Sequence, residues 1–143
     1  MLRAAGGRRL VKAVPAYSAL VIDHFDRPRN VGRFESAADV IEGAADRRTD
    51  GAQFVLTARI SGEFLSEVRF QAFGCPHCIA AASWLSERLA GADQAALAQW
   101  QWREAAVALE VPTEKRGRLL ILEDAVRALA ENWGRKAENA PRP

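Results

Sequence analysis

Residues 53–78 read QFVLTARISGEFLSEVRFQAFGCPHC, and this stretch decides the fold. Apolar and polar side chains alternate over residues 53–60 and again over 67–73, a pattern typical of strands with one buried face. The turn-forming Ser61-Gly62-Glu63 lies between the two runs, so we expect them to pair as an antiparallel hairpin. Residues 40–42 are expected to add a short third strand at the sheet edge.

Helical patterns surround the hairpin. Gly74 ends the second run, and a helix is expected over residues 78–89, stopped by Gly91. The last predicted helix covers residues 118–133, where an apolar stripe at three- and four-residue spacing is closed by Gly134. Further helices are predicted at 16–26, 94–99 and 103–109. The chain therefore predicts an α+β fold, with helices packed on one face of a small antiparallel three-stranded sheet.

Length and composition indicate one globular domain. The chain has 143 residues, of which 49% are hydrophobic and 27% charged, the balance of an ordinary folded protein. We expect this domain to occupy residues 15–134, followed by a frayed tail at 135–143. Residues 1–14 carry basic side chains and no acidic one, which favours a disordered basic tail over an organelle transit peptide.

Charge and hydropathy exclude two broad classes of function. A net charge of +2, with acidic and basic residues mixed along most of the chain, does not favour nucleic acid binding. The apolar runs fall short of the roughly 20 residues that a membrane-spanning helix needs. Two cysteines do not make a secreted disulfide framework, so a reducing, cytoplasmic location is expected.

Both cysteines lie in the motif Cys75-Pro76-His77-Cys78, at the junction between the second strand and the next helix. Their spacing lets the two sulfurs chelate one metal or close a disulfide. Cys75 and Cys78 with His77 or Asp50 could form a zinc site, and two chains could supply four thiolates to a shared cluster. The competing interpretation is that Cys78 is a small buried residue and that no metal is bound.

Several segments together resemble a known family. They are Ala16-Tyr17-Ser18, Val21-Ile22-Asp23-His24-Phe25, Pro28-Arg29-Asn30-Val31-Gly32, Phe73-Gly74-Cys75 and Glu123-Asp124-Ala125-Val126. In this order they look like the signature of the NifU/IscU family of iron-sulfur cluster assembly scaffolds, and the resemblance covers about residues 16–133. The motif at 75–78 taken alone also resembles the active site of DsbA-type thiol oxidases, a family that nothing else in the chain resembles.

The scaffold resemblance implies a protein without enzymatic turnover, on which iron and sulfide are joined into a cluster that then passes to client proteins. The implied partners are a cysteine desulfurase and other cluster-assembly proteins, and a homodimer would suit a shared cluster. Family members bind the cluster through three cysteine thiolates, helped by an aspartate. Thiolate is needed because it is a soft, anionic ligand for iron.

Matched residue by residue, the implied ligand set is incomplete. The family's Cys-Gly-Asp motif reads Asp50-Gly51-Ala52 here, the second cysteine is Cys75, and the third cysteine position holds Arg118. Two of the three ligand cysteines are thus lost, and a guanidinium cannot give up its proton to bind metal. Because these positions converge on one metal in the family fold, we expect an ion pair between Asp50 and Arg118 in its place.

A second implied site is the segment at which the family docks a partner chaperone. It reads Val111-Pro112-Thr113-Glu114-Lys115 here, so Val111, Pro112 and Lys115 are the expected contacts. His24, by contrast, lies on an otherwise apolar helix face and is expected to be a hydrogen-bonded core histidine instead of a ligand.

The leading hypothesis is an iron-sulfur scaffold-like protein, poor in ligands, that acts as an accessory or partner-binding member and retains metal binding only through Cys75. One alternative is a thiol or persulfide redox protein that uses Cys75 and Cys78. The other is an interaction module with neither metal nor redox chemistry.

Overall fold

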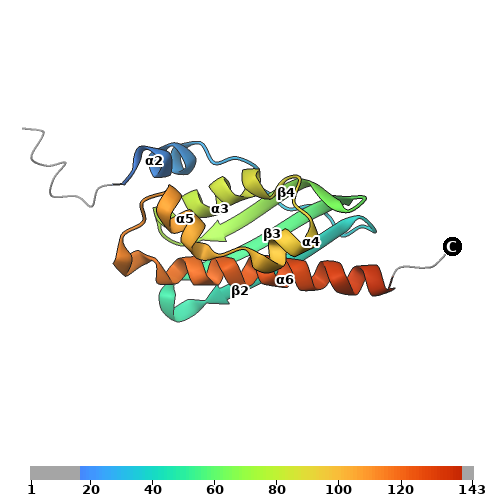
Figure 1. Ribbon diagram of the computed structural model, residues 1–143. Helices are drawn as coiled ribbons and strands as arrows, with labels where there is room; N and C mark the ends of the chain where they lie inside the picture. The colour runs from blue at the N-terminus through green and yellow to red at the C-terminus, as the bar shows by residue number, and fades with distance from the viewer. Residues whose placement is uncertain (1–16, 140–143) are drawn as a thin grey trace, which may run out of the picture.

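The structure, a computed structural model, describes residues 17–139. Its centre is an antiparallel sheet of β2 (Val40–Arg47), β3 (Ala52–Ser61) and β4 (Phe64–Phe73), with β3 in the middle (Figure 1). Every second side chain of β3 from Ala52 to Ala58 is buried, as the alternation predicts. The predicted hairpin is confirmed, and the edge strand β2 extends well beyond residues 40–42.

The α-helices of the described chain pack around this sheet. They are α2 (Ala19–Asp26), α3 (Pro76–Leu89), α4 (Gln94–Gln99), α5 (Trp102–Ala108) and α6 (Gly117–Asn139), joined by the one-turn helices η1 (Arg48–Asp50) and η2 (Thr113–Lys115). In Figure 1, α6 lies along β2 and β3, α3 lies along β4, and α2 packs on α3. Gly43 of β2 allows the close approach of α6, because a side chain there would collide with the backbone of Ala125 and Leu129.

A loop, instead of a helix, covers the opposite face of the sheet. Val31 pairs with Phe70 of β4, and the chain then crosses the sheet. Phe34 is buried on this face, where its backbone N–H donates to Thr57 Oγ1 at 3.0 Å. The Arg69 guanidinium stacks on the Phe34 ring, 4.2 Å from its centroid. The predicted α+β fold with helices on one face is thereby confirmed.

Two predicted helix ends are wrong. The first described helix begins at Ala19 and not at residue 16, because the Ser18 hydroxyl accepts a hydrogen bond from a first-turn N–H and makes Ser18 the N-cap. The last helix does not stop at Gly134 but continues to Asn139. A Cβ on Gly134 would lie 2.8 Å from the Gln94 amide nitrogen, so this glycine makes room for α4 instead of ending α6.

The tail predictions are only partly covered by the structure. Residues 135–139, predicted to fray, are the last turn of α6, whereas the predicted basic tail 1–14 and residues 140–143 lie outside the described residues. Within residues 17–139, no helix combines the length and the apolar composition that crossing a bilayer requires.

Candidate functional site

Three segments that are distant in sequence meet at one end of the sheet. They are the turn before β3, the junction from β4 to α3, and the first turn of α6. The pairing of Gln53 with Phe73 places Gly51 beside Gly74, where an added Cβ would lie 3.2 Å from the Gly51 carbonyl oxygen. Arg118 closes the group, because its Nε donates to the Asp50 carbonyl oxygen at 3.1 Å.

Cys75 and Cys78 are in direct contact at this junction. Cys75 is the N-cap of α3 and is partly exposed, whereas Cys78, in the first turn of the helix, is fully buried. Their sulfurs lie 3.7 Å apart, and the Cys78 backbone N–H donates to the Cys75 carbonyl oxygen at 2.9 Å. The sequence spacing alone predicts this proximity, since residues three apart share one helix face.

Gly74 makes the burial of Cys78 possible. Its φ of +151° suits glycine and strains residues with a side chain. A Cβ at this position would lie 2.8 Å from Cys78 Sγ and 3.0 Å from Cys78 Cβ. The strand end therefore passes directly over the second sulfur and seals it from solvent.

The surroundings favour one negative charge on the pair, located on Cys75. The hydrogen bond from the Cys78 thiol is the largest cause that lowers the pKa of Cys75, and the Cys78 and His77 backbone N–H groups and Arg118 lower it further, against burial. The same hydrogen bond, followed by burial, raises the pKa of Cys78. The outer sulfur is thus a thiolate beside a fixed cation, and the inner sulfur keeps its proton.

The ion pair predicted between the Asp50 carboxylate and the Arg118 guanidinium is not formed. The two residues are in contact, as expected, but the guanidinium binds the Asp50 backbone carbonyl. The Asp50 carboxylate instead faces Arg47, with Nη1 to Oδ2 at 3.7 Å. Arg118 is thereby held across the turn, and it helps to lower the pKa of Cys75.

The four predicted metal ligands do not form one site. His77 is buried with its ring 4.9 Å from that of Tyr17, and its Nε2 has no hydrogen-bond partner in the described part of the chain. Across residues 17–139, no group of three or more histidine, cysteine or acidic side chains is arranged to hold a metal. The structure brings Cys75 and Cys78 together but arranges neither His77 nor Asp50 with them, and metal binding at the two sulfurs stays a prediction.

The predicted chaperone contact is also partly wrong. Val111 is 1% exposed and belongs to the hydrophobic core, so it is unavailable to a partner. Pro112 is the N-cap of η2 and Lys115 is its last residue; both are partly exposed, and their role stays a prediction. His24 is confirmed as a core histidine, because its Nδ1 lies 2.7 Å from the Ser83 hydroxyl.

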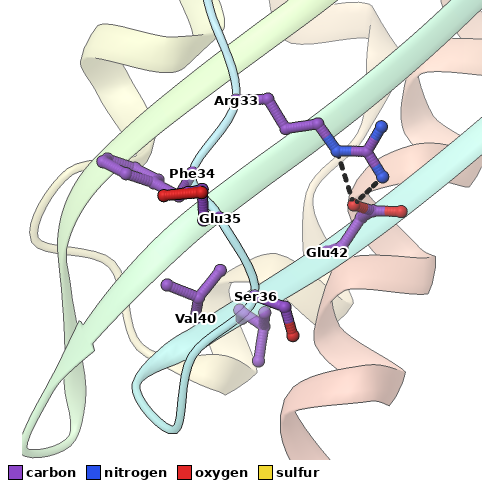
Figure 2. A pocket seen from close by; sticks show the side chains of 7 residues that line it. Arg33, Phe34, Glu35, Ser36, Val40 and Glu42 are labelled. Atoms are coloured by element: carbon purple, nitrogen blue, oxygen red, sulfur yellow. Dashed lines mark hydrogen bonds and ion pairs between the residues drawn. The ribbon is translucent and has the colours of Figure 1, made fainter.

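Two of the surface hollows in the described part of the chain differ in their linings. One of about 330 Å³ adjoins the cysteine site and is lined by Gly51, Ala52 and the 71%-exposed Phe73, among others. The second, shown in Figure 2, lies between the loop on the outer face and β2. There the Arg33 Nε donates to Glu42 Oε1 at 3.0 Å, so the two charges neutralise each other. Neither a thiol nor an imidazole lines this second hollow.

Sequence reasoning missed the effect of Arg118 on Cys75, 43 positions earlier in the chain, whose pKa the guanidinium helps to lower. A permanent cation in place of a lost ligand cysteine was the available signal, because a cation beside a remaining thiolate is favourable. It also missed Phe73, whose position at the end of the solvent-facing side of β4 marks an exposed apolar side chain next to the site.

Comparison with known proteins agrees with the fold. The sequence profile of the NifU-like N terminal domain matches residues 16–140. The iron-sulfur cluster assembly scaffold protein IscU of Escherichia coli K12 is 30% identical over 125 residues, covering 86% of this chain and 98% of the relative. The protein of the same name from Rickettsia prowazekii is 31% identical over 126 residues, covering 87% and 96%. The crystal structure of a nitrogen-fixing NifU-like protein (N-terminal) from Brucella abortus has the same fold, with a TM-score of 0.57 at 12% identity and coverage of 86% and 95%.

Proposed function

Since the chain belongs to the family of NifU-like N-terminal domains, which includes the iron-sulfur cluster assembly scaffolds, we propose that it is an accessory member that does not hold a cluster by itself. The family acts as a scaffold, and its members work with other cluster-assembly proteins. The cluster is thus the cargo.

The observation that carries the proposal is the position of Arg118. Asp50 and Arg118 occupy two of the three positions that carry ligand cysteines in the resemblance, and the guanidinium lies beside the remaining thiol, Cys75. A guanidinium stays charged at any accessible pH and repels an incoming iron cation. A cluster needs several thiolates, and in one chain only Cys75 is both partly exposed and favoured as a thiolate.

Any cluster at Cys75 would therefore need thiolates from another chain. A second copy of this protein or a ligand-complete member of the same family would supply them. The apolar surface at Phe73 next to the site is suited to such a contact, since exposed aromatic side chains are common at the centres of interfaces. The cysteine desulfurase of the same machinery is the proposed source of sulfide.

Anaerobic reconstitution with ferrous iron and sulfide tests the proposal. Wild type should show no stoichiometric cluster per monomer by visible absorbance and by iron and sulfide analysis after gel filtration. The variant Asp50→Cys/Ala52→Asp/Arg118→Cys restores the ligand residues and should gain the cluster absorbance. Adding Cys75→Ser to that variant should remove it again.

A matched control separates the loss of charge from the gain of thiolate. Asp50→Asn/Arg118→Gln removes both charges without adding sulfur, and it should stay colourless. If the wild-type monomer instead binds one cluster per chain after gel filtration, the proposal is refuted.

A further inference from the structure

We propose that Cys75 and Cys78 form a redox-active dithiol that reduces disulfide substrates, with Cys75 as the attacking sulfur and Cys78 as the resolving sulfur. This activity would require neither a metal nor a bound cluster. The substrate class is an accessible disulfide, either of a small thiol or on the surface of a protein. Nothing in the scaffold role needs the second cysteine, so its position calls for a separate explanation.

The geometry gives the two sulfurs different roles. Cys75 is partly exposed and can meet a substrate, whereas Cys78 is 0% exposed and, sealed beneath Gly74, can react only with its neighbour. Their 3.7 Å separation is that of a thiol hydrogen bond, and the two-residue spacing is one at which a dithiol closes to a disulfide. An outer attacking thiol with an inner resolving thiol is the arrangement that completes disulfide exchange within one chain.

The surroundings of Cys75 support the attacking role. Its sulfur lies at the N-terminus of a 14-residue helix, where free backbone N–H groups favour an anion. Arg118 adds a fixed positive charge from a different element, anchored by its bond to the Asp50 carbonyl. Both features place positive potential beside the exposed sulfur, on the side from which a substrate would approach.

The reaction balances in two steps. The Cys75 thiolate attacks one sulfur of a disulfide RSSR, so a Cys75–SR bond forms and the S–S bond breaks, with the electron pair leaving on RS⁻. The Cys78 thiol then gives its proton to this RS⁻ and attacks Cys75 Sγ, forming the Cys75–Cys78 bond and expelling the second RS⁻, which takes up a proton from water. Two electrons pass from the two cysteines to the substrate, and the products are two RSH and an intrachain disulfide. A thiol reductant of the glutathione class would regenerate the dithiol.

Oxidised glutathione is a direct probe of this reaction. Reduced, metal-free, full-length protein is mixed with it anaerobically in the presence of a chelator. The mixture is quenched with acid, free thiols are alkylated, and the intact mass is measured. Wild type should lose both thiols and keep no glutathionyl group. Cys78→Ser should stop at a mixed disulfide on Cys75, with about tenfold more of this species than wild type.

Cys75→Ser should react at least about tenfold more slowly than Cys78→Ser, because its single thiol is buried. Since Cys78 lies in the core, Cys78→Ala provides a second variant without a buried hydroxyl, and circular dichroism checks the fold of each. Rapid quenching of wild type should also reveal a transient mixed disulfide, a readout that needs no substitution. The proposal is overturned if wild type stops at the mixed disulfide, or if Cys75→Ser reacts as fast as Cys78→Ser. Because iron and sulfide are absent, neither result depends on the outcome of reconstitution.

Discussion

Replacing Gly74 with alanine should destabilise the fold and open the cysteine site at the same time. The new Cβ would lie 2.8 Å from Cys78 Sγ and 3.0 Å from Cys78 Cβ, both closer than an ordinary carbon contact. The backbone would also have to hold a φ of +151° with a side chain present. The strand end must therefore shift, and Cys78 should become accessible.

Two terms set the expected magnitude. A side chain held in a conformation that suits only glycine costs of order 1–3 kcal/mol, and overpacking a filled site costs typically 1–3 kcal/mol. Gly74→Ala should thus lower the free energy of unfolding by about 3 kcal/mol. For a chain of this length, that corresponds to a fall in Tm of roughly 10 °C.

Urea unfolding followed by tryptophan fluorescence measures the loss, and Gly62→Ala is the matched control. Gly62 also has a positive φ, +64°, but nothing lies within 4 Å of its added Cβ. In this variant the free energy of unfolding should fall only by the cost of backbone strain, about 1 kcal/mol. The excess loss in Gly74→Ala then contains the collision with Cys78 and the greater backbone strain at φ +151°.

A double-mutant cycle measures the coupling between Gly74→Ala and Cys78→Ala. Cys78→Ala removes the sulfur that the new Cβ would strike, so the combined variant should be more stable than the sum of the single losses predicts, by about 1 kcal/mol. Additive losses, or equal losses for Gly74→Ala and Gly62→Ala, would show that Gly74 does not act by making room for Cys78.

Three further predictions concern Gly43, Cys75 and His24. Gly43→Ala should lower the free energy of unfolding, measured in urea, by about 3 kcal/mol because its Cβ meets the backbone of α6. The control Gly117→Ala, whose Cβ has nothing within 4 Å, should be neutral or slightly stabilising. Equal losses for the two variants would contradict the close packing of Gly43 on α6. The rate of Cys75 alkylation by iodoacetamide should stay nearly constant as the pH falls from about 8 to 6, whereas that of an ordinary thiol falls roughly tenfold per pH unit, because the Cys78 thiol above all, and Arg118 to a smaller extent, lower the pKa of Cys75 to about 4. The midpoint of the profile, measured in acid, should rise in Arg118→Gln, and an unmoved midpoint would exclude this role of the guanidinium. Burial, and then the charge of Arg29, lowers the pKa of His24 in the folded protein. The resulting stability is present above the unfolded pKa of about 6.5 and is lost as the pH falls through the lower folded pKa. His24→Gln should therefore flatten the decline in unfolding free energy below about pH 6.5, and an unaltered decline would assign it to other groups.

The sheet could be predicted from the sequence because alternation along residues 53–73 has one simple cause, a single buried face. The end of α6 could not be predicted in the same way. Gly134 looks like a helix stop, but its lack of a side chain is used for packing against Gln94, and that neighbour is 40 positions away. A glycine that ends a helix and one that admits a neighbouring helix have the same letter, so only the tertiary contact distinguishes them.

The sequence predicts which residues meet at the candidate site but not which of their atoms form the contacts. Spacing placed Cys75 beside Cys78, and the resemblance placed Asp50 beside Arg118. Side-chain charges suggested a carboxylate partner for the guanidinium, yet the bond goes to a backbone carbonyl, which every residue carries and no sequence pattern reveals. Val111 failed for a related reason, because an apolar residue suits a partner surface and a core equally well.

The charge at Cys75 connects the two proposals. In a cluster site, the iron ions stabilise several thiolates at once, so the thiolates need no other cation. Here a single guanidinium stabilises a single thiolate, and the second sulfur keeps its proton and remains inside the fold. Iron at Cys75 would have to approach against Arg118, whereas a neutral disulfide would meet no such repulsion. Oxidation to the Cys75–Cys78 disulfide would also remove the one exposed sulfur from any cluster shared with a second chain. Iron loading and disulfide exchange therefore compete for the same atom, and the fixed cation favours the exchange.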